Sequence, residues 1–233
     1  MPLRATKQHA AETAYLSAQP HEPQQTGPTG LERLPLRNKR GALLYVPPTL
    51  EAGTPAPLAV MLHGAGGNAE HGLHLLRNYA DKDGIILLTP ESRKMTWDII
   101  VQNQYGPDVA FINDCLTNVF DHYLIDPEYV ALGGFSDGAS YALSLGLSNG
   151  QLFTHIIAFS PGFMVPVRVE NKIRVFMSHG TEDTVLPIGS CSRRIVPVLK
   201  REGFDVEYHE FEGPHTIPAD ISQRAVEWFV KKG

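Results

Sequence analysis

The stretch GGFSDGAS, residues 133–140, places a serine between two glycines in the pattern G-x-S-x-G. Ser136 is the central residue, and Gly134 and Gly138 flank it. A serine hydroxyl presented on a sharp turn between a strand and a helix can attack a carbonyl carbon. The five-residue pattern also arises by chance in glycine-rich chains, so the residues around it must decide whether Ser136 does chemistry.

The residues on either side of Ser136 fit a strand, a turn and a helix in that order. The apolar run YVALGGF, residues 129–135, precedes the serine, and the small and apolar residues of DGASYALSLGL, residues 137–147, follow it. Glycines have no Cβ atom, so they allow strand and helix to approach closely around a serine with a strained backbone. This context favours a nucleophile over a structural serine.

A serine hydroxyl needs a base to take its proton and an acid to orient that base. In an α/β sheet with this kind of nucleophile turn, the chain order is serine, then acid, then histidine. Asp183 follows the apolar run IRVFMSHG, residues 173–180, and His215 follows FDVEYHEFE, residues 204–212. We therefore expect Asp183 and His215 to complete a catalytic triad with Ser136.

Other side chains compete for these roles. Glu182 and Asp98 are alternatives to Asp183 as the acid, and we expect Asp98 to bond loop backbone rather than substrate. His63 and His179 also follow apolar runs, but each lies at the very end of its run. At that position an imidazole more readily braces a neighbouring loop by hydrogen bonds than acts as a base.

A glycine-rich loop, LHGAGGN at residues 62–68, follows the first central apolar run. Its backbone amides are open to a ligand, as are the first amides of a helix that begins after Ser136. The amides of Ala65 and Asp137 would bind the negative oxygen that forms when a carbonyl is attacked. A phosphate-binding loop is the alternative, but the lysine of a P-loop and the G-x-G-x-x-G spacing are both missing.

The elements that must position these residues follow an α/β pattern. Two short runs, LERLPLR and GALLYVP at residues 31–37 and 41–47, predict an antiparallel edge pair. Nearly continuous apolar runs then alternate with helical spacing, which is typical of parallel strands buried on both faces. One predicted helix begins after Asn68 as N-cap and continues through Ala80. The pattern predicts about eight mostly parallel strands flanked by helices, and it leaves no insertion for a large lid.

The seven stretches that follow resemble the α/β-hydrolase superfamily, and within it the phospholipase/carboxylesterase family. They are LHGAGGN, YADKDGIILLTPESR, WD at 97 and 98, GGFSDGAS, FSPGF, HGTEDTVLPI and GPHTIP, within about residues 40–230. The resemblance implies an α/β-hydrolase fold with a triad of Ser136, Asp183 and His215. It also implies oxyanion amides at Ala65 and Asp137, and no metal or organic cofactor.

One departure from the family pattern concerns the residue after the nucleophile. Relatives often have glutamine or methionine there, whereas this chain has Asp137, a carboxylate beside the site of developing negative charge. We expect its side chain to point away from that site, toward the N-terminus of the following helix, where negative charge is favourable.

The family includes small bacterial carboxylesterases and acyl-protein thioesterases. The resemblance therefore implies hydrolysis of small to medium carboxylic esters through an acyl-enzyme, with thioesterase or lysophospholipase activity as alternatives. We expect apolar residues in the loops after the strands to line the substrate pocket, although they equally fit a core beneath the loops. These residues are Trp97, Ile99, Phe163, Met164 and Val165.

Two rival functions belong to other classes. A non-catalytic binding protein on the same fold would typically lack a triad residue or the oxyanion glycines, and this chain retains all of them. A metalloenzyme could use His63, His71 and His74, but the chain has no H-E-x-x-H pattern. We expect His71 and His74 to lie on a solvated helix face instead.

The composition bounds the remaining expectations. The 233 residues, 42% hydrophobic and 19% charged, suit one large domain, which we place at residues 31–233 after an extended or flexible arm at residues 1–30. A net charge of −5 without long basic runs argues against nucleic-acid binding. We expect buried, unpaired Cys115 and Cys191, no membrane span, no signal peptide and a cytoplasmic location. The sequence is also compatible with a homodimer.

Overall fold

A single eight-stranded sheet organises the part of the chain that the computed structural model describes, residues 14–34, 41–169 and 171–231. The strand order is β1-β2-β4-β3-β5-β6-β7-β8. The pairs β1–β2 and β2–β4 are antiparallel, and every later pair is parallel. The strands are β1 Gly30–Arg33, β2 Ala42–Val46, β3 Ala56–Leu62, β4 Ile86–Pro90, β5 Ile125–Phe135, β6 His155–Phe159, β7 Arg174–Gly180 and β8 Val206–Phe211.

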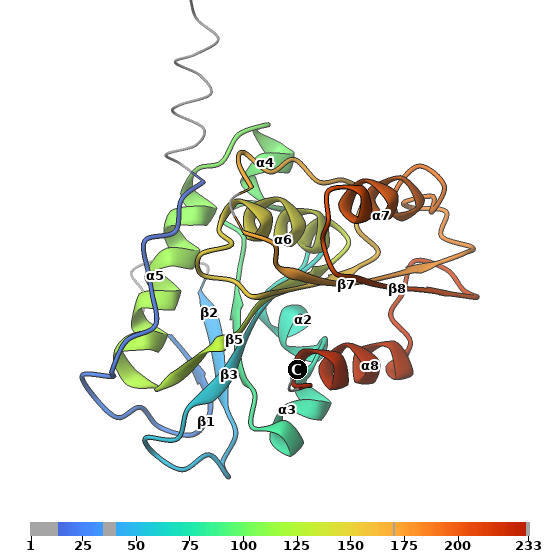
Figure 1. Ribbon diagram of the computed structural model, residues 1–233. Coiled ribbons are helices and arrows are strands. Elements are labelled where there is room, and N and C mark those ends of the chain that lie inside the picture. The colour runs from blue at the N-terminus through green and yellow to red at the C-terminus, as the bar shows by residue number, and fades with distance from the viewer. Residues whose placement is uncertain (1–13, 35–40, 170, 232–233) are drawn as a thin grey trace, which may run out of the picture.

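Helices cover both faces of the sheet, as Figure 1 shows. They are α2 Ala69–His74, α3 Arg77–Asp83, α4 Asp98–Val101, α5 Pro107–His122, α6 Asp137–Ser148, α7 Ser192–Arg201 and α8 Ala219–Phe229. Apolar residues of α5 and α6 pack on one face, and those of α7 join α6 over the later strands. Residues of α2, α3 and α8 form the core on the other face. The predicted α/β-hydrolase fold with an antiparallel edge pair is therefore confirmed.

The helix predicted from residue 69 to residue 80 is wrong in one respect, because the structure divides it into α2 and α3. Asn68 does cap α2, since its side-chain oxygen accepts from the His71 amide at 3.1 Å. At Leu76 the backbone leaves helical geometry, with φ −129° and ψ −2°. Leu76, at the break, is fully buried in the core on this face of the sheet.

Residues 14–29 run in an extended path over α5 and the end of α6, and Figure 1 shows this segment in blue beside α5. Asn149, fully buried at the end of α6, accepts from the Leu16 amide at 2.9 Å. Asn113 of α5 accepts from the amides of Ser17 and Ala18. The first 13 residues of the predicted arm lie outside the described residues.

The two cysteines are free and buried, as expected. Cys115 lies within α5, and Cys191 is the residue before α7. None of the helices in the described ranges is both long enough and apolar enough to cross a bilayer.

Candidate active site

Ser136 lies in the turn that joins the end of β5 to the start of α6. Its φ of 57° and ψ of −119° place it in a region that a residue with a side chain rarely adopts. The glycines on either side are required by space, because a Cβ on Gly138 would lie 2.3 Å from the Leu62 carbonyl oxygen of β3. A Cβ on Gly134 would lie 2.6 Å from the backbone of Gly138. The close approach expected of these glycines is confirmed.

Asp183 and His215 meet across the loops that follow β7 and β8. The His215 Nδ1 atom donates to Asp183 Oδ2 at 2.5 Å, and the Asp183 side chain is completely buried. The other carboxylate oxygen accepts from the amides of Val185 and Leu186, at 2.9 and 2.8 Å. Burial acts to raise the pKa of Asp183, but these amides and His215 outweigh it and hold the pKa below its usual value. Asp183 is therefore a carboxylate that orients the imidazole.

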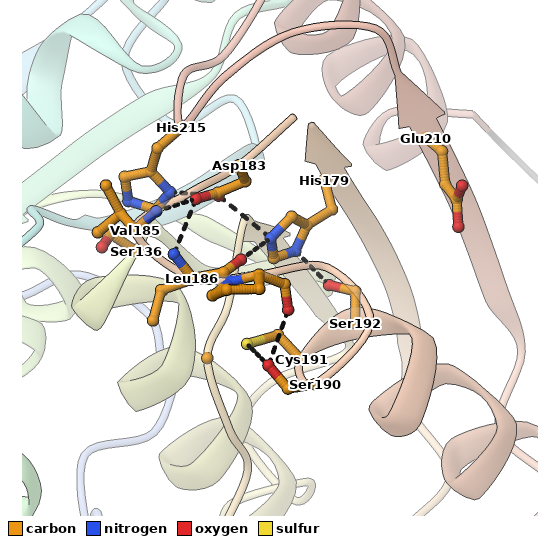
Figure 2. A network of polar contacts seen from close by, with 12 residues as sticks. Ser136, His179, Asp183, Val185, Leu186, Ser190, Cys191, Ser192, Glu210 and His215 are labelled. Carbon is orange, nitrogen blue, oxygen red and sulfur yellow. Dashed lines mark hydrogen bonds and ion pairs between the residues drawn. The ribbon is translucent and has the colours of Figure 1, made fainter. Parts of the chain in front are cut away.

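The second nitrogen of His215, Nε2, is buried and has no hydrogen-bond partner in the described part of the chain. The ring packs on Phe135, the residue before Ser136, with ring centroids 4.6 Å apart. Figure 2 shows Ser136 beside the His215 ring, with Asp183 on the other side of that ring. The structure thus brings Ser136, Asp183 and His215 together, in the order that the sequence predicts.

The two histidines that compete with His215 brace loops, as expected. His63 donates from Nδ1 to the Gly64 carbonyl at 2.7 Å and accepts from the Ser92 amide at 3.0 Å. His179 donates from Nε2 to the Leu186 carbonyl at 2.8 Å and accepts from the Ser192 hydroxyl at 2.6 Å. Both rings therefore use both nitrogens in the scaffold.

The glycine-rich loop lies against the nucleophile turn. A Cβ on Gly64 would lie 3.4 Å from the Cβ atom of Ser136. Gly66 adopts a φ of +70°, and its amide donates to the Met95 carbonyl at 2.8 Å. Among the described residues, the amides of Ala65 and Asp137 have no hydrogen-bond acceptor. Two unpaired amides close to a serine hydroxyl can bind an oxyanion.

The Asp137 side chain bonds to Thr96, whereas we expected it to point toward the N-terminus of the following helix. Its Oδ2 atom accepts from the Thr96 hydroxyl at 2.7 Å, so the carboxylate is held by the loop after β4. It lies at the first residue of α6, where the helix dipole also favours negative charge.

A family model described as Phospholipase/Carboxylesterase matches residues 102–232, more than half of the chain. The chain belongs to the phospholipase/carboxylesterase family. The matched range includes Ser136, Asp183 and His215 and begins after the glycine-rich loop.

Curated proteins are similar to this chain over part of their length. An acyl-protein thioesterase 1 of Gibberella zeae is 29% identical over 58% of this chain and 62% of its own length. A probable feruloyl esterase C of Aspergillus flavus is 26% identical over 78% of this chain and 66% of its own length. The chain thus spans about two thirds or less of these relatives.

Solved structures share the fold at low identity. A phospholipase/carboxylesterase from Dyadobacter fermentans covers 86% of this chain and 100% of its own, with a TM-score of 0.64 and 22% identity. The fluorophosphonate-binding serine hydrolase F of Staphylococcus aureus covers 88% of this chain and 100% of its own. Its TM-score is 0.70 at 14% identity.

A cleft of about 440 Å³ opens beside the catalytic candidates of this family member. Its walls are the loop at residues 64–67, three residues of the α2 region and the loop that runs from His215 into α8. Phe135, Leu75 and Ile217 supply its apolar surface.

His71 and His74 are exposed, as expected, but their exposed helix face is also a wall of the cleft. The described residues contain no group of three side chains suited to hold a metal ion.

None of the five residues expected in the substrate pocket lines this cleft. Trp97 was the wrong choice, because it is fully buried, stacks on Tyr141 and donates to the His63 carbonyl at 2.9 Å. Ile99 packs partly buried against the same core. Phe163, Met164 and Val165 lie on the loop after β6, and Val165 remains 47% exposed.

Three serines of α6 hold that loop, a role that the sequence analysis missed. Ser140, Ser144 and Ser148 accept from the amides of Gly162, Val165 and Val167 at 2.8, 2.9 and 3.0 Å. Each hydroxyl also donates to a carbonyl four residues earlier in the helix. The spacing of four residues in a helix that begins at the nucleophile was the available signal, since it places all three hydroxyls on one face.

Asp98 bonds loop backbone, as expected, and it does so as half of a buried pair. Its Oδ2 atom accepts from the amides of Gly106 and Asp108, at 2.8 and 3.0 Å. The Asp108 carboxylate in turn accepts from the amides of Asp98 and Arg93, at 2.7 and 2.5 Å. Burial raises the pKa of both carboxyls, that of Asp108 to about 6. The pair fixes the loop between β4 and α5.

Proposed function

We propose that this chain is a serine hydrolase of carboxylic esters, with Ser136 as nucleophile, His215 as base and Asp183 as the acid that orients it. The observation that supports this most is the buried Nε2 atom of His215, which has no partner in the described ranges and lies beside Ser136. Because Nδ1 donates to Asp183, Nε2 of the neutral ring carries a lone pair that can accept the serine proton.

The reaction proceeds through an acyl-enzyme. Ser136 attacks the ester carbonyl as His215 takes its proton, and the imidazolium is stabilised by Asp183. His215 then protonates the leaving alcohol, and water repeats the sequence to release the acid.

The amides of Ala65 and Asp137 would bind the oxyanion of the tetrahedral intermediate. Both are unpaired in the described residues, and both lie on backbone fixed by neighbouring contacts. Loss of one such donor typically costs about 3 kcal/mol of transition-state stabilisation. This pair is therefore as important to the proposed rate as the triad.

A small-molecule ester of small to medium size is the proposed substrate class, because the cleft is open and holds about 440 Å³. The same nucleophile would also cleave thioesters, and three curated relatives are named acyl-protein thioesterase 1. Feruloyl esterases among the relatives favour the oxygen ester.

Paired substrates test the proposal. Aryl esters and thioesters of acetate, butyrate and octanoate should be hydrolysed by the wild-type protein and not by Ser136→Ala. Full activity of Ser136→Ala on any of them would require another nucleophile. No hydrolysis of any of them by the wild type, together with binding of intact ester, would favour a non-catalytic binding protein.

A further inference from the structure

Three consecutive residues of the loop after β4 touch both walls of the oxyanion site. The Met95 carbonyl accepts from the Gly66 amide at 2.8 Å, in the loop that carries Ala65. The Thr96 hydroxyl donates to Asp137 Oδ2 at 2.7 Å, on the other wall. The Trp97 indole donates to the His63 carbonyl at 2.9 Å, at the base of the glycine-rich loop.

The far end of this segment is anchored in the core. The Asp98 amide donates to Asp108, and the Tyr141 hydroxyl of α6 donates to Asp98 at 3.0 Å. Trp97 stacks on the same tyrosine, with ring centroids 5.1 Å apart. The segment is therefore anchored to α6, the helix that begins at Asp137.

The contact between Thr96 and Asp137 has an electrostatic consequence that the contacts of Met95 and Trp97 lack. Asp137 is a carboxylate on the residue whose amide would stabilise an oxyanion, and two neighbouring like charges repel each other. The Thr96 hydroxyl fixes the carboxylate against the loop and donates a hydrogen bond to its charge. Thr96 is only 8% exposed, so water is a poor substitute for that hydroxyl.

We propose that residues 95–97 form a bracket that sets the two oxyanion amides in place, and that Thr96 is a positioning residue which holds the Asp137 carboxylate away from the developing negative charge. The inference rests on the proposed ester hydrolysis and assigns a new role within it. Met95 acts through its carbonyl alone, because its side chain is 72% exposed.

A double-mutant cycle tests the bracket. Thr96→Val keeps the shape of the side chain and removes the hydroxyl, so it should lower kcat about tenfold with KM nearly unchanged. Binding of phenylboronic acid, which forms a tetrahedral anion on a serine, should weaken by a similar factor. In an Asp137→Asn background, where the charge is absent, Thr96→Val should change kcat less than twofold.

One control variant and a stability measurement complete the experiment. Thr117→Val makes the same change on the exposed face of α5, where the hydroxyl donates to Asn113, and should leave kcat unchanged. Equal losses from Thr96→Val in both backgrounds, or a loss that tracks a lowered Tm, would overturn the charge-positioning role.

The outcome separates the two proposals. Hydrolysis lost in Ser136→Ala, with Thr96→Val equal to wild type, would overturn the bracket and leave the proposed function standing. Hydrolysis that survives in Ser136→Ala would remove the proposed function and the bracket together.

Discussion

His179 lies 3.2 Å from the oxygen of Asp183 that accepts from His215, and the side chains of His179 and Asp183 are both completely buried. Figure 2 shows the carboxylate between the two imidazoles. Burial, more than any other contribution, lowers the pKa of His179, so its ring is neutral at neutral pH. The Nε2 group of this neutral imidazole, which donates to the Leu186 carbonyl, lies beside the Asp183 carboxylate and stabilises its ionised form without adding a second positive charge.

Replacement of this second imidazole should weaken catalysis without abolishing it. His179→Asn removes a donor beside a buried carboxylate, and hydrogen bonds to charged groups are worth about 1.5–3 kcal/mol. We expect kcat to fall roughly tenfold, with KM changed less than kcat. Steady-state kinetics on one aryl ester measure both. A kcat equal to that of wild type would mean that His179 only supports its loop.

The pH dependence should identify His215 as the base. The base must be neutral to accept a proton, and ordinary imidazoles titrate near pH ~6.5. The pKa values of Asp183 and His179 both lie below their usual ranges, so neither titrates in that region. We expect kcat/KM to rise through one ionisation between about pH 6 and 8 and then level off.

Two histidine variants give the matched comparison for this profile. His215→Asn should remove the rising limb together with the activity, while His71→Asn, on the exposed face of α2, should keep the limb. The assignment would be reversed by a limb that disappears in His179→Asn and persists in His215→Asn.

Filling the cleft should show where substrate binds. Ile217 lines the cleft, whereas Val165 lies on the loop after β6 and belongs to the set expected from the sequence. Ile217→Trp should lower kcat/KM for octanoate esters about tenfold, with a smaller effect on acetate esters, because bulk blocks the longer chain. Val165→Trp should leave both unchanged. The reverse result would indicate that the substrate binds at the loop after β6, as the sequence analysis expected.

Stability at acid pH should depend on His155, which is 4% exposed and lies against Trp228 and Phe229. Burial, and then the positive charge of Arg174, lowers its pKa from 6.5 to about 4. The unfolded chain therefore takes up a proton at higher pH than the folded protein, and stability falls as pH drops from about 6.5 toward 4. Over this window the contribution is about 3 kcal/mol.

His155→Phe should remove this contribution, whatever its effect on stability at pH 7. Urea unfolding at pH 7 and pH 4.5 measures it as the difference between wild type and variant in the stability lost between the two pH values. Equal losses in the two proteins would show that His155 does not titrate in this window.

The sequence predicted the inner part of the sheet well because strands such as β3, β4, β6 and β7 are buried on both faces and appear as nearly continuous apolar runs. Ser136, Asp183 and His215 were singled out because each lies just after a predicted strand, and the carboxyl ends of parallel strands meet at one edge. The division between α2 and α3 at Leu76 could not be found this way. Apolar spacing on both sides of that break is compatible with one continuous helix.

The cleft and the bracket depend on contacts between distant segments, which no local pattern encodes. From the sequence we expected Trp97 in the pocket, but its indole nitrogen donates to the His63 carbonyl and its ring stacks on Tyr141. Thr96 carries no motif of its own, and its role follows only from the position of Asp137 across the site. Ile217 could have been suspected, since it follows His215 by two residues.

The central claim is that Ser136 is the nucleophile, and the most direct test is a covalent adduct on that residue. The protein would be treated with a fluorophosphonate, and its intact mass and proteolytic peptides would be measured. We predict one adduct per chain, on the peptide containing Ser136, with none on Ser136→Ala. An unmodified wild-type protein, or an adduct that persists on Ser136→Ala, would contradict the assignment.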